Sequence, residues 1–472
     1  MLKSIIMFGL ETGVFLLVVF CLLLACLFEF INGFHDTANA VATVIYTNTL
    51  RPTTAVVWSG IWNFIGVNIG GIAVAMGIVN LLPVELLVDQ NLAHGLAMVF
   101  ALLLSAILWN FGTWYVGLPA SSSHALIGSI LGIGIACNFI PGSEGAAVNW
   151  HKAQEIGLSL LISPFFGFAA AIGMMYLFKR AIKNELIYKE PIPGKKPPLW
   201  IRSILITTCS LVSLGHGSND GQKGVGLMML ILIGILPARF ALNNSYPMDE
   251  TLHKVNMIQS IVLKSDTTRF SLSEKKTFTA IKSNCEQAKA LLENKTSSDE
   301  IEENKRFDVR KDVLLIHKNT KQILDSPNFS ISKNDKLEIN KALKTLKEST
   351  DYAPRWVIIL ISISLGLGTM IGWKRIVKTV GEKIGKQHMS YAQGASAEMV
   401  AAITVGLSSF NGLPVSTTHV LSSGIAGTMV AKKGLKNLQK RTIRNILLAW
   451  VLTLPVTILL SGGLFLLFRF LF

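Results

Sequence analysis

A polar phrase that occurs twice in the chain has the residue types of an oxyanion-binding site. Residues 117–124 read Gly-Leu-Pro-Ala-Ser-Ser-Ser-His, and residues 412–419 read Gly-Leu-Pro-Val-Ser-Thr-Thr-His. In each copy we expect Gly-Leu-Pro to end one helix and the hydroxyl residues to open the next, whose first N–H groups are free and carry the positive end of the helix dipole. Such a tip can bind a tetrahedral oxyanion without a formal positive charge. The candidate anion-binding residues are Ser121, Ser122, Ser123, His124, Ser416, Thr417, Thr418 and His419.

The repetition of this phrase decides between two interpretations of it. A single copy would be explained by helix caps and by small residues at a helix–helix contact. Two copies, each among apolar residues where hydroxyls are costly unless they face protein, water or a ligand, favour the anion site. For His124 and His419, contact with the substrate and capping of the tip stay open as equal alternatives.

A second duplicated phrase places one carboxylate in each half of the chain. Residues 33–40 read Gly-Phe-His-Asp-Thr-Ala-Asn-Ala, and residues 217–224 read Gly-Ser-Asn-Asp-Gly-Gln-Lys-Gly. Asp36 and Asp220 lie within apolar segments, where a charge is expensive and usually functional. Their oxygens could bind a small cation or carry a proton, and a structural ion pair is the alternative.

Differences between the two copies favour proton over sodium coupling. Asn39 and Asn219 offer amide oxygens for a cation, but Lys223 stands at the repeat position of Asn39, so its ammonium can take the place of a metal ion. His35 replaces the amide of Asn219 and can titrate near neutral pH. Glu398 lies within the apolar run before the second tip, with no route for its charge to reach water, and is a further coupling candidate.

The spacing of the two phrases indicates an internal repeat. Asp36 precedes Pro119 by 83 residues, and Asp220 precedes Pro414 by 194 residues. Residues 239–353 are rich in Lys, Glu, Asn and Ser, and we interpret them as a small soluble helical insert. Without an insert of about 115 residues the second spacing becomes roughly 79, so each half carries both phrases at nearly the same distance.

The composition requires a membrane environment for the elements that carry these residues. Half of the 472 residues are hydrophobic, only 15% are charged, and the mean hydropathy is +0.48. Runs of about 20 apolar residues, the length of a membrane helix, recur along the chain. The first of them is expected to be an uncleaved membrane helix rather than a signal peptide. Apolar segments fall near residues 11–34, 54–82, 94–116, 124–140, 156–178, 200–214, 224–238, 354–373, 391–411, 419–431 and 445–471.

The charges of the loops predict two membrane repeats of opposite orientation. The net charge of +15 comes from basic loops beside apolar runs, which is the pattern of cytoplasmic loops and not of a nucleic-acid-binding protein. Basic residues flank the second tip but not the first, so the tips should enter as re-entrant hairpins from opposite sides and meet near the midplane. The insert is placed outside by the same counting. The expected domains are a first repeat (1–178), a cytoplasmic linker (179–199), the start of the second repeat (200–238), the insert (239–353) and the rest of the second repeat (354–472).

The four phrases, in this order, resemble those of the inorganic phosphate transporter (PiT) family, and in particular its bacterial low-affinity permeases. The resemblance implies symport of inorganic phosphate across the bacterial inner membrane. It also implies that the coupling ion is a proton and that phosphate travels as a neutral complex with Mg²⁺ or another divalent cation. A homodimer within membrane lipid and an elevator-like motion are further implications. Members that use sodium carry Gly-Ala-Asn-Asp with Asn three residues later, and this chain departs from that pattern at His35 and Lys223.

Three other functions were weighed against phosphate transport. A sulfate carrier is the nearest, because both anions are tetrahedral. A phosphate sensor would need an output motif in the insert, and a membrane enzyme would need a nucleophile with its base or a metal cluster. The sequence shows none of these features clearly, and it predicts a transporter without catalytic residues, cofactor or dedicated metal site.

Overall fold

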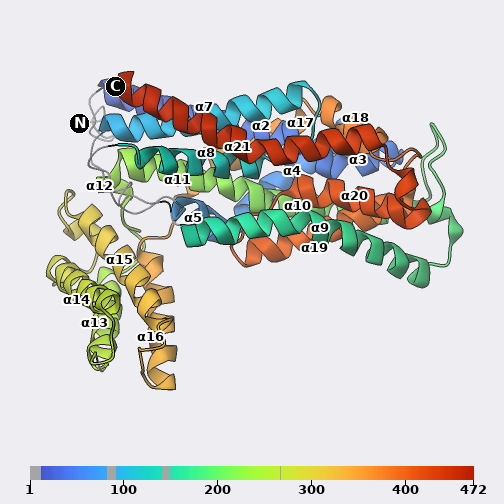
Figure 1. The fold of residues 1–472 in the computed structure, drawn as a ribbon. Helices are drawn as coiled ribbons and strands as arrows, with labels where there is room; N and C mark the ends of the chain where they lie inside the picture. Colours follow the sequence, from blue (N-terminus) through green and yellow to red (C-terminus); the bar gives the residue numbers. More distant parts are fainter. Residues whose placement is uncertain (1–11, 82–91, 141–147, 149, 266, 472) are drawn as a thin grey trace. The chain divides into compact units, whose positions relative to one another are not determined.

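The chain folds into helices throughout the part that the structure describes. The computed structural model describes residues 12–81, 92–140, 148, 150–265 and 267–471 (Figure 1). Over these ranges it contains no extended strand, only an isolated bridge between Gly385 and Leu438. The predicted all-helical class is confirmed. The loops at 83–91 and 141–147, which helped to orient the first tip, lie outside the described residues.

The apolar segments of the sequence become two runs of helices, one in each half. The first run contains α2 (Thr12–Asp36), α3 (Ala38–Tyr46), α4 (Pro52–Ile69), α5 (Ala73–Val79), α7 (Leu92–Tyr115), α8 (Ser122–Cys137) and α9 (Trp150–Ala181). The second contains α10 (Leu199–His216), the π-helical turn η2 (Gly217–Gly221), α11 (Gln222–Ile235), α17 (Arg355–Met370), α18 (Lys374–Glu382), α19 (Tyr391–Phe410), α20 (Thr417–Lys433) and α21 (Lys440–Leu471). Within the described chain, five helical stretches are long and apolar enough to cross a membrane, or seven if each of two bent pairs is one span.

Glycines with left-handed backbone occur at matching places in the two halves. Gly71 and Gly372, with φ of +74° and +75°, lie at the bends between α4 and α5 and between α17 and α18. Gly117 and Gly412, with φ of +71° and +67°, lie where α7 turns into α8 and where α19 turns into α20. Residues with a Cβ avoid this conformation, so glycine sets the same breaks in both halves. The matching breaks support an internal repeat, and the opposite orientation of its halves stays a prediction.

Each half supplies a long helix that packs against the other half. From the first half, α9 packs along α20, and from the second, α21 packs along α7 and α8, as Figure 1 shows for α21. A Cβ on Gly167 of α9 would lie 2.7 Å from the Val420 carbonyl of α20. Ser461 of α21 donates a hydrogen bond of 2.8 Å to the Ser129 carbonyl of α8. Close contact between small residues is a usual basis of helix association in lipid, so the two halves are interlocked.

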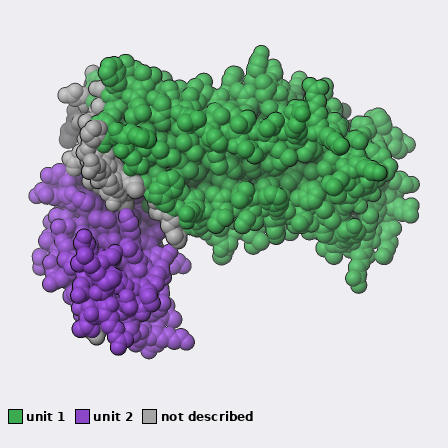
Figure 2. Space-filling model, in the orientation of Figure 1, with its two compact units in different colours: residues 1–83, 91–228, 354–472 green, residues 84–90, 229–353 purple. Residues whose placement is uncertain are grey.

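Residues 229–353 belong to a second compact unit, which comprises the end of α11 and the predicted insert (Figure 2). Its helices include α13 (Met248–Leu263), α14 (Leu272–Leu292), α15 (Arg306–Leu324) and α16 (Lys333–Leu346). These helices bury apolar residues such as Val255, Ile281, Val313 and Ile339 completely. The unit therefore has a hydrophobic core of its own.

A buried arginine ties the two ends of this insert together. The Nη1 atom of Arg310 donates to the Ala241 carbonyl over 3.0 Å and to the Thr350 carbonyl over 2.7 Å. The N–H of Asn243 adds a 2.8 Å bond to the Ser349 carbonyl. Arg310 is 1% exposed, and this burial lowers the pKa of its guanidinium. The segments that enter and leave the insert therefore lie side by side, so a linker of a few residues is long enough to join them.

We expect a variant with a short Gly-Ser linker in place of residues 245–347 to fold like the full chain. Its melting temperature should stay within about 4 °C, the shift that about 1 kcal/mol produces in a small domain. Size-exclusion chromatography and thermal unfolding in detergent measure this. Aggregation of the shortened chain would show that the membrane helices depend on the insert.

Candidate functional site

The two Gly-Leu-Pro tips share one backbone design. After α7 and after α19, the N–H of the tip leucine, Leu118 or Leu413, reaches back to a carbonyl five residues earlier over 2.9 Å. Ser121 and Ser416 then cap α8 and α20, and each hydroxyl accepts a hydrogen bond of 3.2 Å from the N–H three residues later. Each tip therefore ends one helix and opens the next, as the sequence predicts.

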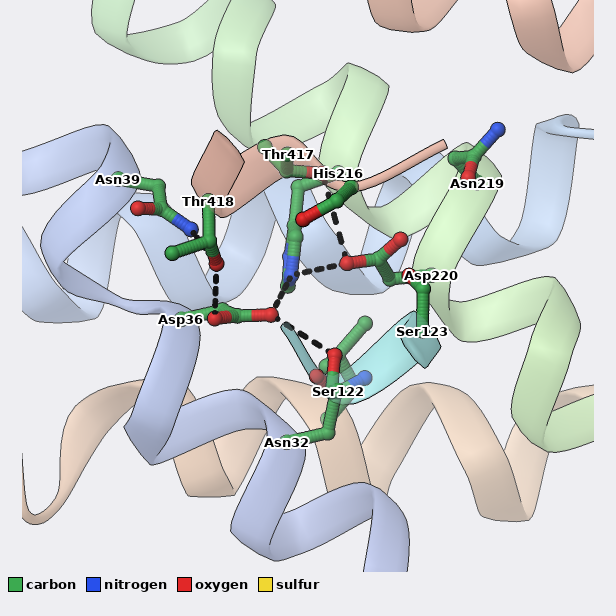
Figure 3. A network of polar contacts seen from close by, with 12 residues as sticks. Asn32, Asp36, Asn39, Ser122, Ser123, His216, Asn219, Asp220, Thr417 and Thr418 are labelled. Carbon is green, nitrogen blue, oxygen red and sulfur yellow. Dashed lines mark hydrogen bonds and ion pairs between the residues drawn. The ribbon is translucent and has the colours of Figure 1, made fainter. Parts of the chain in front are cut away.

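The next hydroxyls of the tips meet the two aspartates (Figure 3). Asp36 accepts hydrogen bonds from Ser122 over 3.0 Å and from Thr418 over 2.6 Å, one from each tip. Asp220 accepts a longer one of 3.4 Å from Thr417. These five side chains belong to residues that are at most 3% exposed. The two duplicated phrases thus form one buried polar site.

A histidine that ends α10 lies between the two aspartates (Figure 3). The Nε2 atom of His216 is 3.1 Å from Asp220 Oδ2 and 3.7 Å from Asp36 Oδ2. Its Nδ1 is 3.0 Å from Oδ1 of Asn63, whose amide nitrogen donates to Thr369. Nδ1 therefore carries a hydrogen, and Nε2 needs one too if it is to donate to a carboxylate. With both hydrogens in place His216 is a cation shared by the two halves.

Lys223 connects the second aspartate with both tips. Its ammonium pairs with Asp220 and donates to Ser123 of the first tip. It also donates to the carbonyl of Val415 in the second tip over 2.7 Å, and Ser123 donates to that same carbonyl over 3.1 Å. Lys223 is 2% exposed. A buried ammonium with three oxygen partners is well satisfied, so it holds the two tips in one arrangement.

The remaining members of the two phrases support this cluster. Asn39 donates to Thr418 over 2.9 Å, and His35 lies with Nδ1 3.2 Å from Asp36 Oδ1. Asn219 instead holds the second tip, because its Oδ1 accepts from the N–H of Val415 over 3.2 Å. The structure thus brings Asn39 and His35 to the aspartates and uses Asn219 to fix the backbone of a tip.

The segment of the sequence that contains this cluster matches a known protein family. Residues 32–461 match the phosphate transporter family, a span that contains both duplicated phrases and both aspartates. The chain belongs to the phosphate transporter family.

The similarity between this chain and its relatives covers nearly the whole length of the sequence. The chain is 42% identical to the low-affinity inorganic phosphate transporter PitA of Escherichia coli (strain K12), with 97% of each chain covered. It is also 42% identical to the low-affinity inorganic phosphate transporter of Buchnera aphidicola from Acyrthosiphon pisum, with 95% of this chain and 96% of the relative covered. With these bacterial relatives and its membrane-crossing helices, it is a multi-pass protein of the bacterial inner membrane.

A solved structure has the same fold. It is titled "The sodium-dependent phosphate transporter", and the TM-score is 0.54 at 19% identity, with 97% of this chain and 100% of that chain covered. At this identity the likeness concerns the fold alone.

The two tip histidines of the transporter lie with their rings against each other, and one of them stacks on a tryptophan of α21. The ring centroids of His124 and His419 are 4.5 Å apart, and those of His419 and Trp450 are 4.0 Å apart. Trp450 of α21 also donates to the carbonyl of Pro119 in the first tip over 3.0 Å. Both histidine rings are buried. The stack therefore joins the first tip, the second tip and α21.

Glu398 lies apart from the aspartates in a pocket of hydroxyls. It accepts hydrogen bonds from Thr43 of α3 and from Thr208 of α10, and it is completely buried in α19. No hydrogen bond or ion pair given for the described residues joins it to Asp36 or Asp220. The predicted role of Glu398 in coupling is therefore not supported by a direct contact with either aspartate, and it stays a prediction.

One group of the described side chains has the spacing of a metal site. Ligand atoms of Asp36, His216 and Asp220 all lie within 4.8 Å of one another. The sequence suggested amide oxygens as the partners of the carboxylates, but the structure supplies a histidine. A metal ion would need the Nε2 of His216 without its proton. Protons and a divalent cation would therefore compete for the same atoms.

Two residues of the site were missed or undervalued by sequence reasoning. His216 is not among the candidates named from the sequence, although it stands four residues before Asp220 and so is expected on the same helical face. That spacing was a usable signal. Trp450 gave none, because it lies far along the chain, and only the packing of α21 brings it to the tips.

We expect Trp450→Phe to slow uptake of radiolabelled phosphate by about two- to tenfold. The variant keeps an aromatic ring on His419 but loses the hydrogen bond to Pro119, which is worth about 0.5–1.5 kcal/mol.

The matched control is Trp58→Phe, which removes a 2.8 Å bond to Ser210 between α4 and α10, away from both tips. Uptake by this control should change by less than about twofold, since exposed substitutions away from special features have small effects. Equal effects of the two substitutions would contradict a role of the stack in aligning the tips.

Proposed function

We propose that the protein is a secondary active symporter that carries inorganic phosphate into the cell together with protons. Its relatives are named as low-affinity inorganic phosphate transporters, which supports the substrate. The observation that carries the proposal is that hydroxyls of both tips, two aspartates, a lysine and a histidine meet in one buried cluster. Because the two tips share one set of charged side chains, a movement of one tip changes the contacts of the other.

The binding step would use the tips as donors. The first N–H groups of α8 and α20, with the hydroxyls of Ser122, Ser123, Thr417 and Thr418, suit the oxygens of phosphate. Those hydroxyls donate mostly to the aspartates, and phosphate oxygens are acceptors of the same kind. A rotation of each hydroxyl can therefore exchange a carboxylate for phosphate. Mostly neutral donors also allow release.

The partners of the aspartates favour the proton as the coupling ion. Asp220 faces Lys223 through one oxygen and His216 through the other. Asp36 faces His35, His216 and two hydroxyls. Sodium prefers several oxygen ligands, and here nitrogen groups that can exchange protons occupy those oxygens. Groups that can exchange protons therefore surround both aspartates, which supports the proton as the coupling ion.

A divalent cation fits this scheme as cargo rather than as a resident ion. A neutral complex of Mg²⁺ with hydrogen phosphate would bring no net charge into the buried site, which lowers the cost of transfer. Asp36 and Asp220 are hard oxygen ligands, the type that Mg²⁺ takes. Uptake that rises with Mg²⁺ at constant phosphate is the expected sign.

The deciding experiment is uptake of ³²P-phosphate by proteoliposomes under an imposed proton gradient, with and without sodium and Mg²⁺. We expect an inward proton gradient to drive uptake and Asp36→Asn to lower it at least about tenfold. That substitution removes the charge that pairs with His216 and that receives two charge-assisted hydrogen bonds, each worth about 1.5–3 kcal/mol. Uptake that needs sodium would overturn proton coupling. Excess sulfate that blocks uptake as well as unlabelled phosphate does would overturn the choice of anion.

We expect Lys223→Asn to make uptake responsive to sodium. The variant restores the amide that the first half has at this repeat position and frees an oxygen of Asp220. Uptake is measured at matched ionic strength with sodium or potassium. The matched control is Lys254→Asn on α13 of the insert, whose ammonium lies 3.6 Å from the partly exposed Glu250. If sodium does not change uptake by the Lys223 variant, the idea that the Lys223 ammonium occupies the place of a metal ion has no support.

A further inference from the structure

A second buried carboxylate lies two turns before Asp36 and takes no part in the cluster described above. Glu29, Asn32 and Asp36 follow one another on α2 at spacings of three and four residues, so they share one face of the helix. Glu29 is 0% exposed. Its Oε1 accepts a hydrogen bond of 3.0 Å from Asn32, and no partner is found for its Oε2 among the described residues. A carboxylate is rarely buried in this way without a function.

The second half of the chain makes room for this carboxyl group. A Cβ on Gly224 would collide with Oε2 of Glu29, so the glycine leaves the carboxyl group the position that it occupies. The first half has Ala40 at the corresponding repeat position and the second half has Ser213 at that of Glu29. Glu29 and Gly224 therefore differ from their repeat counterparts in ways that fit each other, and Lys223, which also differs from its counterpart, precedes Gly224 in the chain.

A negative charge on Glu29 would lie close to the charged groups of the cluster without pairing with any cation among the described residues. The charged groups that act on it are Asp220, His216 and Lys223. Lys223, and His216 when it carries both hydrogens, face Asp36 and Asp220, so an ionised Glu29 would add a third carboxylate charge whose Oε2 has no partner among the described residues. The other helices against α2 add little, because α17 has only Arg355 and α7 only His94 and Tyr115, each close to a helix end. A neutral carboxyl costs far less to bury than an ion.

We infer that Glu29 is the residue that binds the transported proton and releases it to couple phosphate movement to the proton gradient. This inference rests on the proposed proton–phosphate symport. A proton from water on the outer side bonds to a carboxylate oxygen of Glu29, and the same proton passes to water on the inner side after phosphate has left. In between, the bound proton cancels the charge of Glu29, so phosphate does not meet a third carboxylate charge near the cluster. No other bond forms or breaks.

Glu29→Gln tests this directly, because glutamine keeps the size of the side chain and a neutral group but cannot release a proton. We expect uptake driven by a proton gradient to fall at least about tenfold, within the range of typical coupling free energies. Exchange of external ³²P-phosphate for internal phosphate at equal pH should continue, since the loaded protein can still move in both directions. Wild-type exchange should slow at alkaline pH, and that of the variant should not. Gradient-driven uptake at the wild-type level would overturn the inference.

Two further variants keep the test decisive. Glu29→Asp retains a titratable group and should therefore retain gradient-driven uptake. Glu190→Gln makes the same chemical change at an exposed residue that pairs with Lys432, and this variant should take up phosphate like the wild type. If the glutamine variant does not fold, the pH profile of exchange by Glu29→Asp replaces it, and a profile identical to that of wild type overturns the inference. Wild-type protein that shows no proton-driven uptake would instead refute the proposed symport, whatever Glu29 does.

Discussion

Charge that is buried among membrane helices has to be balanced by charge close by, and the centre of this molecule is built around that requirement. Asp36 and Asp220 come from different halves, yet His216 touches both. Lys223 completes the balance and also contacts both tips. Neither tip can therefore move without changing the partners of a buried charge. A site of this kind favours concerted motion, because partial opening would leave a charge unpaired.

The hydroxyls give the same cluster its reversibility. Ser122, Thr417 and Thr418 hold the aspartates through hydrogen bonds that cost little to exchange for others. The stack of His124, His419 and Trp450 lies behind them and contributes packing instead of charge. One side of each tip is thus polar and adaptable, and the other is aromatic. This division lets the tips keep their register while the donors change partners.

Much of this arrangement could be predicted from the sequence, because it depends on local patterns that are repeated. Helix breaks at Gly117 and Gly412 follow from the duplicated phrase, and the spacing of Asp36 and Asp220 showed that both halves carry a carboxylate. The contacts of His216 and Trp450 could not be derived in the same way, since they depend on which helix packs against which. The pairing of Glu29 with Gly224 is of this second kind, because no single segment reveals it.

The packing of α21 against α8 also bears on how the protein is made. The hairpin of α7 and α8 is synthesised early, but the small-residue face of α8 receives its partner only when the last helix emerges. In the same way, α9 can pack against α20 only after α20 has been synthesised. Until then these faces meet lipid or each other, and incomplete chains expose them to membrane proteases and to misassembly. A chain with a shortened α21 would therefore leave the hairpin of α7 and α8 without the helix that packs against it.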